Sequence, residues 1–283
     1  MPRSIRALPL VSFALVPLAA AHAAAHGSGG VVALRYRFVH GQTFAYRFIA
    51  TGRATATGDL SIQDGFTMPY RSSESATVRE RVLSVDSQGR ATVAVSVSIL
   101  HAAETRGRTT TTSPTTTKTA TVRIAADGAV SGTMVEAVNE AFVLPLGTLP
   151  SGPLSLGTRW TTPSRLIEVM TPATPDVFAR PAATNTLLSS GPARGVRGMI
   201  QAIIASVARP AYTLTFPTSG RGTLRLHGAG QAVGRTVFDV ASGQLLSSTA
   251  SYTIELDQQL RDRHGGPRTA HTRIVWTMSF QRM

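Results

Sequence analysis

Few residues of this chain have both the side chain and the spacing that catalysis or metal binding requires. Beyond the first 25 residues no two histidines stand four positions apart, and neither a His-Glu-x-x-His nor a Gly-x-Ser-x-Gly motif occurs. His264 and His271 flank one charged hairpin loop together with Asp262, which fits either a surface metal site or two solvated histidines. Because metal sites usually show more converging ligands, the sequence favours solvated histidines and predicts no catalytic residue, metal ligand or cofactor.

Three carboxylates and one glycine cluster are better explained by turns and bends than by chemistry. Asp86, Asp127 and Asp239 each lie in or near a predicted turn, where aspartate commonly accepts hydrogen bonds from the backbone. Residues 228–234 are rich in glycine, but they lie between predicted strands and not before a helix, as a phosphate-binding loop requires. We interpret this stretch as a bend that lets the sheet curl.

Apolar side chains are therefore the main candidates for a binding site. They fall on the apolar faces of predicted strands and of one predicted helix, where most of them are expected to form the core. An incompletely covered curved sheet would leave some of them around a cavity for an acyl chain or a similar apolar ligand. The predicted cavity-lining residues are Tyr36, Phe38, Phe44, Tyr46, Ile200, Ile204, Tyr252 and Trp276. Arg194 and Arg197 flank the predicted helix and either contact a lipid headgroup or are solvated.

The charge and the composition of the chain restrict its partners. The formal net charge is +13, and because Lys118 is the only lysine, arginine carries nearly all of the positive charge. An arginine-rich surface attracts anions such as lipid phosphates and acidic glycans. No nucleic-acid-binding motif occurs, so nucleic acid is not an expected partner. The absence of cysteine excludes disulfides and thiolate chemistry, so the fold must rest on its core and on strand pairing.

The N-terminal residues are typical of a signal peptide. Arg3 and Arg6 precede a mostly apolar stretch over residues 7–20, and the small residues at 21–25 suit a signal peptidase. The stretch is too short to span a bilayer, which disfavours the alternative of a membrane anchor. We predict a signal peptide over residues 1–25 and an exported protein, periplasmic or extracellular.

Alternation of apolar and polar residues, which is typical of strands with one buried face, recurs through most of residues 26–283. The clearest case is Gln244–Leu256, which follows a turn at residues 241–243. Other predicted strands lie at 34–38, 44–48, 78–85, 90–99, 122–126, 212–216, 223–227, 236–240 and 274–280. The first two carry aromatic triplets at matching spacing, which are expected to pair. The threonine-rich residues 109–119 are interpreted as an exposed loop or the ragged end of a long hairpin.

Two short stretches follow a helical period instead. A capping box at Thr133 and Glu136 predicts a short helix over Met134–Phe142. Apolar residues three and four positions apart predict a second helix over Val196–Val207. Residues 172–192 show few strand signals and are predicted to be a loop.

These elements predict a mainly β fold in which residues 26–283 form a single β-rich domain. Its expected form is a long antiparallel meander, curved into a sheet or an incomplete barrel and partly covered by the two helices. A β-sandwich, or two small β-domains, is the alternative. A connector rich in proline and glycine spans residues 144–153, and the residues on either side of Gly157 resemble those on either side of Gly41. This similarity predicts two related halves divided near residues 144–153.

A family resemblance points in the same direction. An exported chain with a long meander and two covering helices resembles the LolA/LolB-type lipoprotein-carrier half-barrels. The Arg-Tyr-x-Phe-x-x-Gly-Gln-Thr sequence over residues 35–43 also resembles the opening strands of uncharacterised secreted bacterial β-proteins. The resemblance implies a fold, and no carrier motif transfers residue by residue.

Together these observations predict a non-catalytic exported protein that binds a lipid or another hydrophobic or anionic ligand in a curved β-sheet. Peripheral contact with a membrane is compatible with this prediction. The alternative is a structural or adaptor protein of the cell envelope that binds another envelope protein. An enzyme would need a cleft with a converging acid, base and nucleophile, and nothing in the linear sequence points to one.

Overall fold

The structure, a computed structural model, describes residues 30–59, 69–131, 147–163, 182–193, 196–218, 222–261 and 268–283. Thirteen strands and no helix occur in these residues, and all the strands belong to one antiparallel sheet. The sheet does not close on itself, because its outermost strands β6 (Val130–Ser131) and β7 (Arg159–Pro163) do not pair with each other. The prediction of an antiparallel meander in one curved, unclosed sheet is confirmed.

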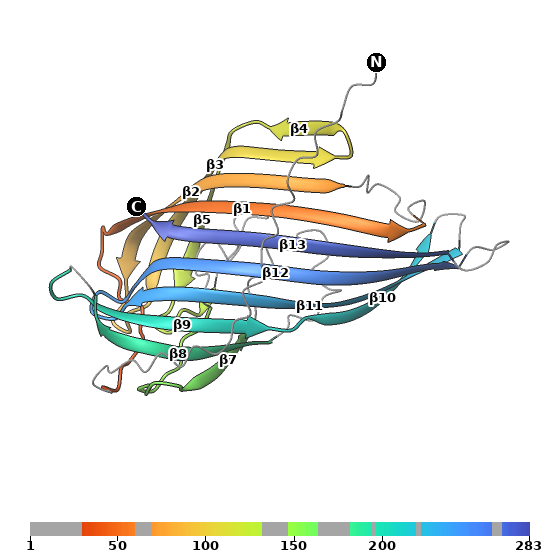
Figure 1. Ribbon diagram of the computed structural model, residues 1–283. Coiled ribbons are helices and arrows are strands. Elements are labelled where there is room, and N and C mark those ends of the chain that lie inside the picture. The colour runs from red at the N-terminus through yellow and green to blue at the C-terminus, as the bar shows by residue number, and fades with distance from the viewer. Residues whose placement is uncertain are drawn as a thin grey trace, which may run out of the picture.

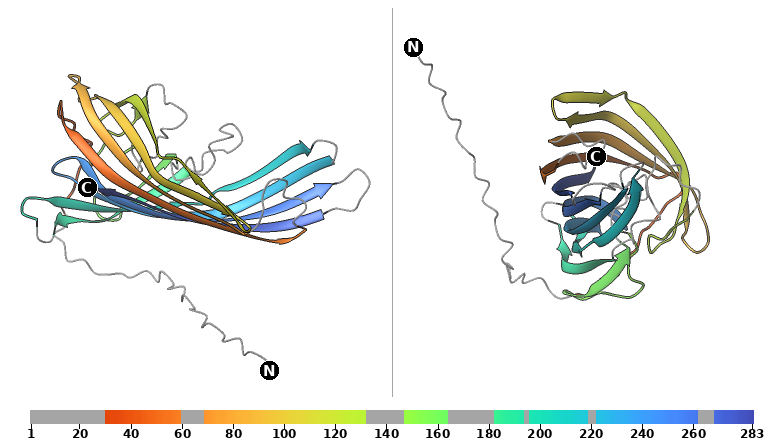
Figure 2. Two further views of the ribbon diagram at one scale, coloured as in Figure 1. Left: turned by 90° about the horizontal axis from the view of Figure 1, so that it is seen from above. Right: turned by 90° about the vertical axis from the view of Figure 1, so that its right-hand side faces the viewer.

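Long neighbouring strands give the sheet its shape (Figure 1). The other strands are β1 (Thr43–Gly58), β2 (Tyr70–Val85), β3 (Ala91–Arg106), β4 (Thr109–Ser113), β5 (Thr116–Ile124), β8 (Ala182–Pro192), β9 (Ile200–Ala208), β10 (Ala211–Thr218), β11 (Gly222–Asp239), β12 (Gln244–Arg261) and β13 (Arg268–Arg282). Their order is β6-β5-β3-β2-β1-β13-β12-β11-β9-β8-β7, so the first long strand pairs with the last. Figure 2 shows the sheet curled at one end, with β1 and β10 to β13 extending beyond it.

Side chains of alternate residues define two faces of this sheet. The register pairs Gly52 with Trp276 and Trp276 with Tyr252, so these three positions lie in one row on the same face. We call this the inner face, because it carries the buried core, and the opposite one the outer face. The core at the curled end includes the large side chains Leu34, Tyr36, Phe44, Tyr46, Phe48, Phe238 and Phe280. The period of two in the sequence thus corresponds to one buried face.

The predicted helix over Val196–Val207 is wrong, because residues 200–208 form strand β9. This strand lies between β8 and β11 and pairs with both, so its backbone groups are bonded on both sides. Ile204 is fully buried, whereas Ile200, four residues earlier, is 41% exposed. The strand shows instead in the alternation around Ile204, because Ala202 and Ile204 are fully buried while Ile203 between them is only half-buried. The other predicted helix, Met134–Phe142, lies outside the described residues.

The predicted first strand over residues 34–38 is also wrong. This segment does not pair with β1 and instead crosses the curled end of the sheet, with Leu34 and Tyr36 buried in the core. The amide of Tyr36 donates to the carbonyl of Ala126 at 2.8 Å, and that of Arg37 donates to the carbonyl of Gly243 at 3.1 Å. The segment therefore joins two turns that lie far apart in the sequence.

Two glycine turns at corresponding places support the prediction of related halves. The amide of Gly41 donates to the carbonyl of Val82 at 2.9 Å, and the amide of Gly157 donates to that of Leu187 at 2.8 Å. Both glycines have a positive φ, 78° and 82°, and each stands two residues before a strand, β1 or β7. The common origin of the halves stays a prediction.

The structure tests two further sequence predictions, one for residues 172–192 and one for the threonine-rich residues 109–119. The predicted loop over residues 172–192 is wrong from Ala182 onward, where β8 begins. In the threonine-rich stretch the hairpin interpretation holds, because residues 109–113 form β4 against the distal half of β3. The described residues contain no helix that is long and apolar enough to cross a membrane.

Candidate functional site

The inner face carries a second apolar cluster beyond the core of the curled end. Its buried members are Ala183, Ala208, Ala232, Tyr252 and Ile254, with Leu256, Ile274 and Trp276 packed against them. The register places Trp276 and Tyr252 beside each other, with Gly52 on one side and Ala232 on the other. Large side chains on β12 and β13 therefore stand between strands that present small residues.

The contact between Trp276 and Gly52 fixes the position of the indole ring. A Cβ atom added to Gly52 would lie 2.6 Å from Cε2 of Trp276, which is closer than side-chain atoms pack. The ring therefore lies directly over the glycine of the neighbouring strand and remains half-buried. Only a residue without a side chain permits this approach.

Half-buried apolar side chains continue from Trp276 along the inner face. We define the inner apolar strip as Trp276, Ile274, Leu256, Leu226 and Leu224, which lie on β13, β12 and β11. Each of them is partly open to solvent, unlike the fully buried Tyr252 beside them. Trp276, Ile274 and Leu256 pack against the second cluster, and Leu224 packs against a separate small cluster of Leu260 and Ala270. Partly exposed apolar side chains gathered on one sheet face suit contact with a ligand or partner.

The structure separates the ten residues predicted for the site. Tyr36, Phe44, Tyr46 and Ile204 are buried in the core of the curled end, and Phe38 packs partly buried against it. Tyr252 and Trp276 lie together in the second cluster. Ile200 lies exposed at the start of β9, Arg197 is exposed in the turn before it, and Arg194 is outside the described residues. Their contact with a ligand stays a prediction.

Aromatic contacts hold the core group of these residues in place. The rings of Tyr46 and Phe280 stack with centroids 4.5 Å apart, and Tyr36 meets Phe238 edge-on at 5.3 Å. The guanidinium of Arg282 lies 5.5 Å from the ring centre of Phe44. These residues pack between β1, β13 and the N-terminal segment, whereas Trp276 of the second cluster is only half-buried.

Glu80 is a buried acid that sequence reasoning missed. It lies on the inner face of β2, in register with Phe44 on β1 and Val95 on β3. Among the described residues, its Oε1 atom has no hydrogen-bond partner. Burial raises the pKa of Glu80 to about 8, and burial followed by the nearby charge of Glu80 raises the pKa of Tyr46. The sequence could have revealed this burial, because Glu80 stands at the same alternate positions as the apolar residues Ala76, Val78 and Val82, which are buried.

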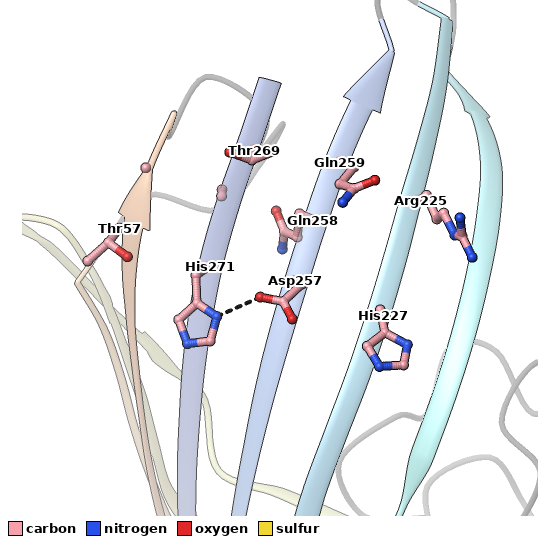
Figure 3. Close-up of a pocket in the computed structure, with 10 residues that line it drawn as sticks. Thr57, Arg225, His227, Asp257, Gln258, Gln259, Thr269 and His271 are labelled. Carbon is pink, nitrogen blue, oxygen red and sulfur yellow. Dashed lines mark hydrogen bonds and ion pairs between the residues drawn. The ribbon is translucent and has the colours of Figure 1, made fainter. Parts of the chain in front are cut away.

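The outer face carries a polar groove of about 550 Å³ near the far ends of β1 and β11 to β13. Thr57, His271, Asp257 and His227 occupy successive strands in one register row (Figure 3). His271 Nδ1 lies 2.8 Å from Asp257 Oδ1, and its Nε2 lies 3.0 Å from Glu255 Oε2. The hydrogen bond to Asp257, helped by the one to Glu255, raises the pKa of His271 above its ordinary value.

The described side chains of this polar groove do not converge as metal ligands do. The two carboxylates bind opposite nitrogens of the His271 ring, so the three groups diverge. Throughout the residues that the structure describes, no three His, Asp or Glu side chains converge to hold a metal ion. His264 and Asp262, named with His271 in the sequence, lie outside these residues.

The three turn aspartates have the role that their positions predict. Asp86 Oδ1 accepts from the amides of Gln88 and Arg90 at 2.9 and 3.0 Å. Asp127 Oδ1 accepts from the amide two residues later at 3.0 Å, and so does Asp239 Oδ1. Hydrogen bonds from Arg90 lower the pKa of Asp86 below its ordinary value. These carboxylates stabilise turns.

Comparison with known proteins does not assign the chain to a family. No protein-family model matches the chain, and no curated protein matches it in sequence. The similarity to lipoprotein-carrier half-barrels and to secreted β-proteins therefore stays a prediction.

Proposed function

We propose that this chain is an exported, non-catalytic protein that binds the acyl chain of a lipid, or a similar apolar chain, along the inner face of its open sheet. The observation that supports the proposal best is the inner apolar strip. Its five side chains lie on the same face of β11, β12 and β13, and all of them are partly open to solvent. Burying them against an apolar chain would contribute about 25 cal/mol for each Å² removed from water.

The charge of the inner face favours a ligand with an uncharged polar end. Burial raises the pKa of Glu80 to about 8 and also raises that of Glu74, so both acids tend toward the neutral form. Both lie on the inner face of β2, but Glu80 is enclosed in the core of the curled end. Glu74 is in register with Ala50 of β1, which pairs with Met278, two residues from Trp276. An anionic headgroup beside Trp276 would therefore gain no cationic partner from Glu74. We therefore expect a neutral lipid to bind better than its anionic counterpart.

Export is the second part of the proposal, and it is supported by the sequence alone. The positive start, the short apolar stretch and the small residues that follow suit a signal peptide over residues 1–25. An open, curved antiparallel sheet is also the form that the resemblance to lipoprotein carriers implies. A carrier outside the cytoplasm would shield the apolar chain from water during transfer.

A matched pair of substitutions on β13 tests the inner face. Ile274 and Val275 are adjacent, aliphatic and half-buried, and they point to the inner and outer faces. Ile274→Asp is expected to weaken the binding of a fluorescent monoacylglycerol at least tenfold, because it places a charge in apolar contact. Val275→Asp should change the affinity by less than about twofold, since the ligand does not touch that face.

Circular dichroism and thermal unfolding establish that both variants fold, and Ile274→Thr replaces the aspartate variant if that one does not. Equal losses of affinity in the inner-face and outer-face variants would contradict the proposal. So would a folded wild-type chain that binds neither the monoacylglycerol nor the corresponding fatty acid.

One observation favours the alternative of an envelope adaptor. β4 pairs only with β3, and all five of its residues are exposed, so the described sheet has a bare polar edge there. Such edges accept a strand from another protein. Cross-linking from a photoreactive residue at Thr111 would capture a specific envelope protein if the adaptor role holds, and would give no discrete product if lipid binding is the only role.

A further inference from the structure

The outer face contains a second groove, of about 690 Å³, formed by β13, β1, β2 and β3. This groove lies on the opposite side of the sheet from the contact between Trp276 and Gly52. Gly52 lines the groove, and the side chains of its sequence neighbours Thr51 and Arg53 point into it. The polar side chains that line it include Arg53, Arg71, Thr51, Ser73, Thr105 and Thr277. Among the residues that the structure describes, no acidic side chain lines this groove.

Two arginines face each other in this groove. The register of β1 and β2 pairs Arg53 directly with Arg71, and both side chains are exposed on the outer face. Like charges directly opposite on neighbouring strands repel each other, so the pair destabilises the empty sheet. Neither guanidinium forms an ion pair with a carboxylate of the residues that the structure describes.

Hydroxyl groups stand beside the two arginines. Thr51 and Thr277 hydroxyls lie 2.7 Å apart, and the Thr105 hydroxyl lies 2.9 Å from that of Thr110. Each hydroxyl has one donor and two acceptor positions, so a hydrogen bond between two of them leaves further capacity for a ligand. The groove thus combines paired guanidinium groups with neutral hydrogen-bonding groups.

We propose that this groove binds the phosphate or sulfate ester of a soluble polyhydroxylated ligand, such as a phosphorylated sugar. The oxyanion lies between Arg53 and Arg71, because two guanidinium groups offer planar pairs of N–H donors to its oxygens. The hydroxyls of Thr51, Ser73 and Thr277 bond the neighbouring hydroxyls of the sugar. The anion also removes the repulsion between the two arginines.

The hydroxyl groups around the two arginines favour a small polyhydroxylated ligand over a membrane surface. Binding to a flat bilayer needs only protruding basic residues, whereas Arg53 and Arg71 share this groove with the hydroxyls of threonine and serine. The groove is on the face opposite the inner apolar strip. The inference therefore stands independently of lipid binding, and either one can fail without the other.

Thermal unfolding of the full chain in a phosphate-free buffer of low salt tests the site. The probes are glucose 6-phosphate, inorganic phosphate, inorganic sulfate and glucose, and the variants are Arg53→Gln and Arg71→Gln. Arg47→Gln is the matched control, because Arg47 lies on the outer face of the same strand, six residues or roughly 20 Å from Arg53. A ligand that binds only the folded state raises Tm with its concentration.

We expect glucose 6-phosphate to raise the Tm of the wild type and of Arg47→Gln, and glucose alone to leave it unchanged. Arg53→Gln and Arg71→Gln should each weaken the apparent affinity about tenfold or more, through the loss of charged hydrogen bonds. Without a ligand both variants should unfold at or above the wild-type Tm, because the repulsion is gone. A Tm that is not lowered would show that the substitution removes the binding site without damaging the fold.

Three results would overturn the inference. The first is stabilisation of Arg53→Gln by glucose 6-phosphate that equals the stabilisation of the wild type. The second is the failure of every oxyanion to stabilise the wild type at any concentration used. The third is binding to vesicles that contain phosphatidylglycerol, weakened equally by Arg47→Gln and Arg53→Gln, which would indicate a diffuse basic surface. Inorganic phosphate and sulfate that bind as well as glucose 6-phosphate would limit the site to the oxyanion and remove the sugar from the proposal.

Discussion

Replacing Glu80 with glutamine is expected to raise the free energy of unfolding at pH 8.5 by about 4 kcal/mol while changing it by less than about 1 kcal/mol at pH 4.5. The reason is the burial of this carboxyl on the inner face, which raises its pKa from 4.5 to about 8. Between these two pKa values the folded chain binds a proton that the unfolded chain has released. The contribution of Glu80 to stability is therefore fully present below pH 4.5 and is lost as the pH rises toward 8.

Urea unfolding of both proteins across this pH range measures the effect. The wild type should lose stability between pH 4.5 and pH 8.5 relative to Glu80→Gln, and the two curves should meet at the acidic end. The comparison at pH 4.5 is the internal control, because a neutral carboxyl and an amide have nearly the same shape and both need hydrogen bonds. Curves that stay parallel over the whole range would show that Glu80 is not buried in this way.

Truncating Ile204 to alanine is expected to lower the free energy of unfolding by about 2–5 kcal/mol, because it opens a cavity in the core. Ile204 is fully buried in the main cluster, and Ile200 on the same strand is 41% exposed. Ile200→Ala should therefore cost less than about 1 kcal/mol. Urea unfolding of both variants gives the two values.

This pair tests how burial varies along β9. Residues four positions apart share one face on a helix and on a strand alike, so the expected difference arises because Ile200 lies at the strand end and Ile204 in the middle. Similar costs for the two substitutions would contradict the structure of β9.

The strands that bury one face could be predicted from the sequence. Val93, Val95 and Val97 on β3, and Tyr252 and Ile254 on β12, are all buried, as their alternation indicates. A strand whose one face is buried along its whole length has an apolar residue at every second position. This pattern is visible in the sequence whichever strands lie beside it. The alternation did not predict which strands pair with each other or how far the strands extend.

β9 was misread because apolar residues occupy both of its faces, although only the inner one is buried. It lies between two strands, and apolar residues point to both faces: Ile204 inward, and Ile203 and Val207 outward. Such a strand loses its alternation, and its apolar residues then fall by chance at spacings of three and four. The usable signal was its content of β-branched residues, which favours a strand over a helix.

The polar features of the site depend on register, which the linear sequence does not contain. Arg53 and Arg71 face each other because β1 and β2 pair at that point, and either strand shifted by two residues would separate them. His271 lies between Asp257 and Glu255 for the same reason on β12 and β13. Glu80 was accessible in principle, as a charged residue at an apolar position of a clear alternation.

Quenching of Trp276 by a monoacylglycerol with bromine atoms along its acyl chain tests lipid binding on the inner face most directly. The chain contains two tryptophans, so Trp160→Phe isolates the fluorescence of Trp276, and Trp276→Phe isolates that of Trp160 on β7. Bromine quenches only on contact. The proposal predicts that the brominated lipid, and not its unbrominated form, quenches Trp276 with saturation and leaves Trp160 unchanged. Fluorescence of Trp276 that stays constant at saturating lipid would contradict it.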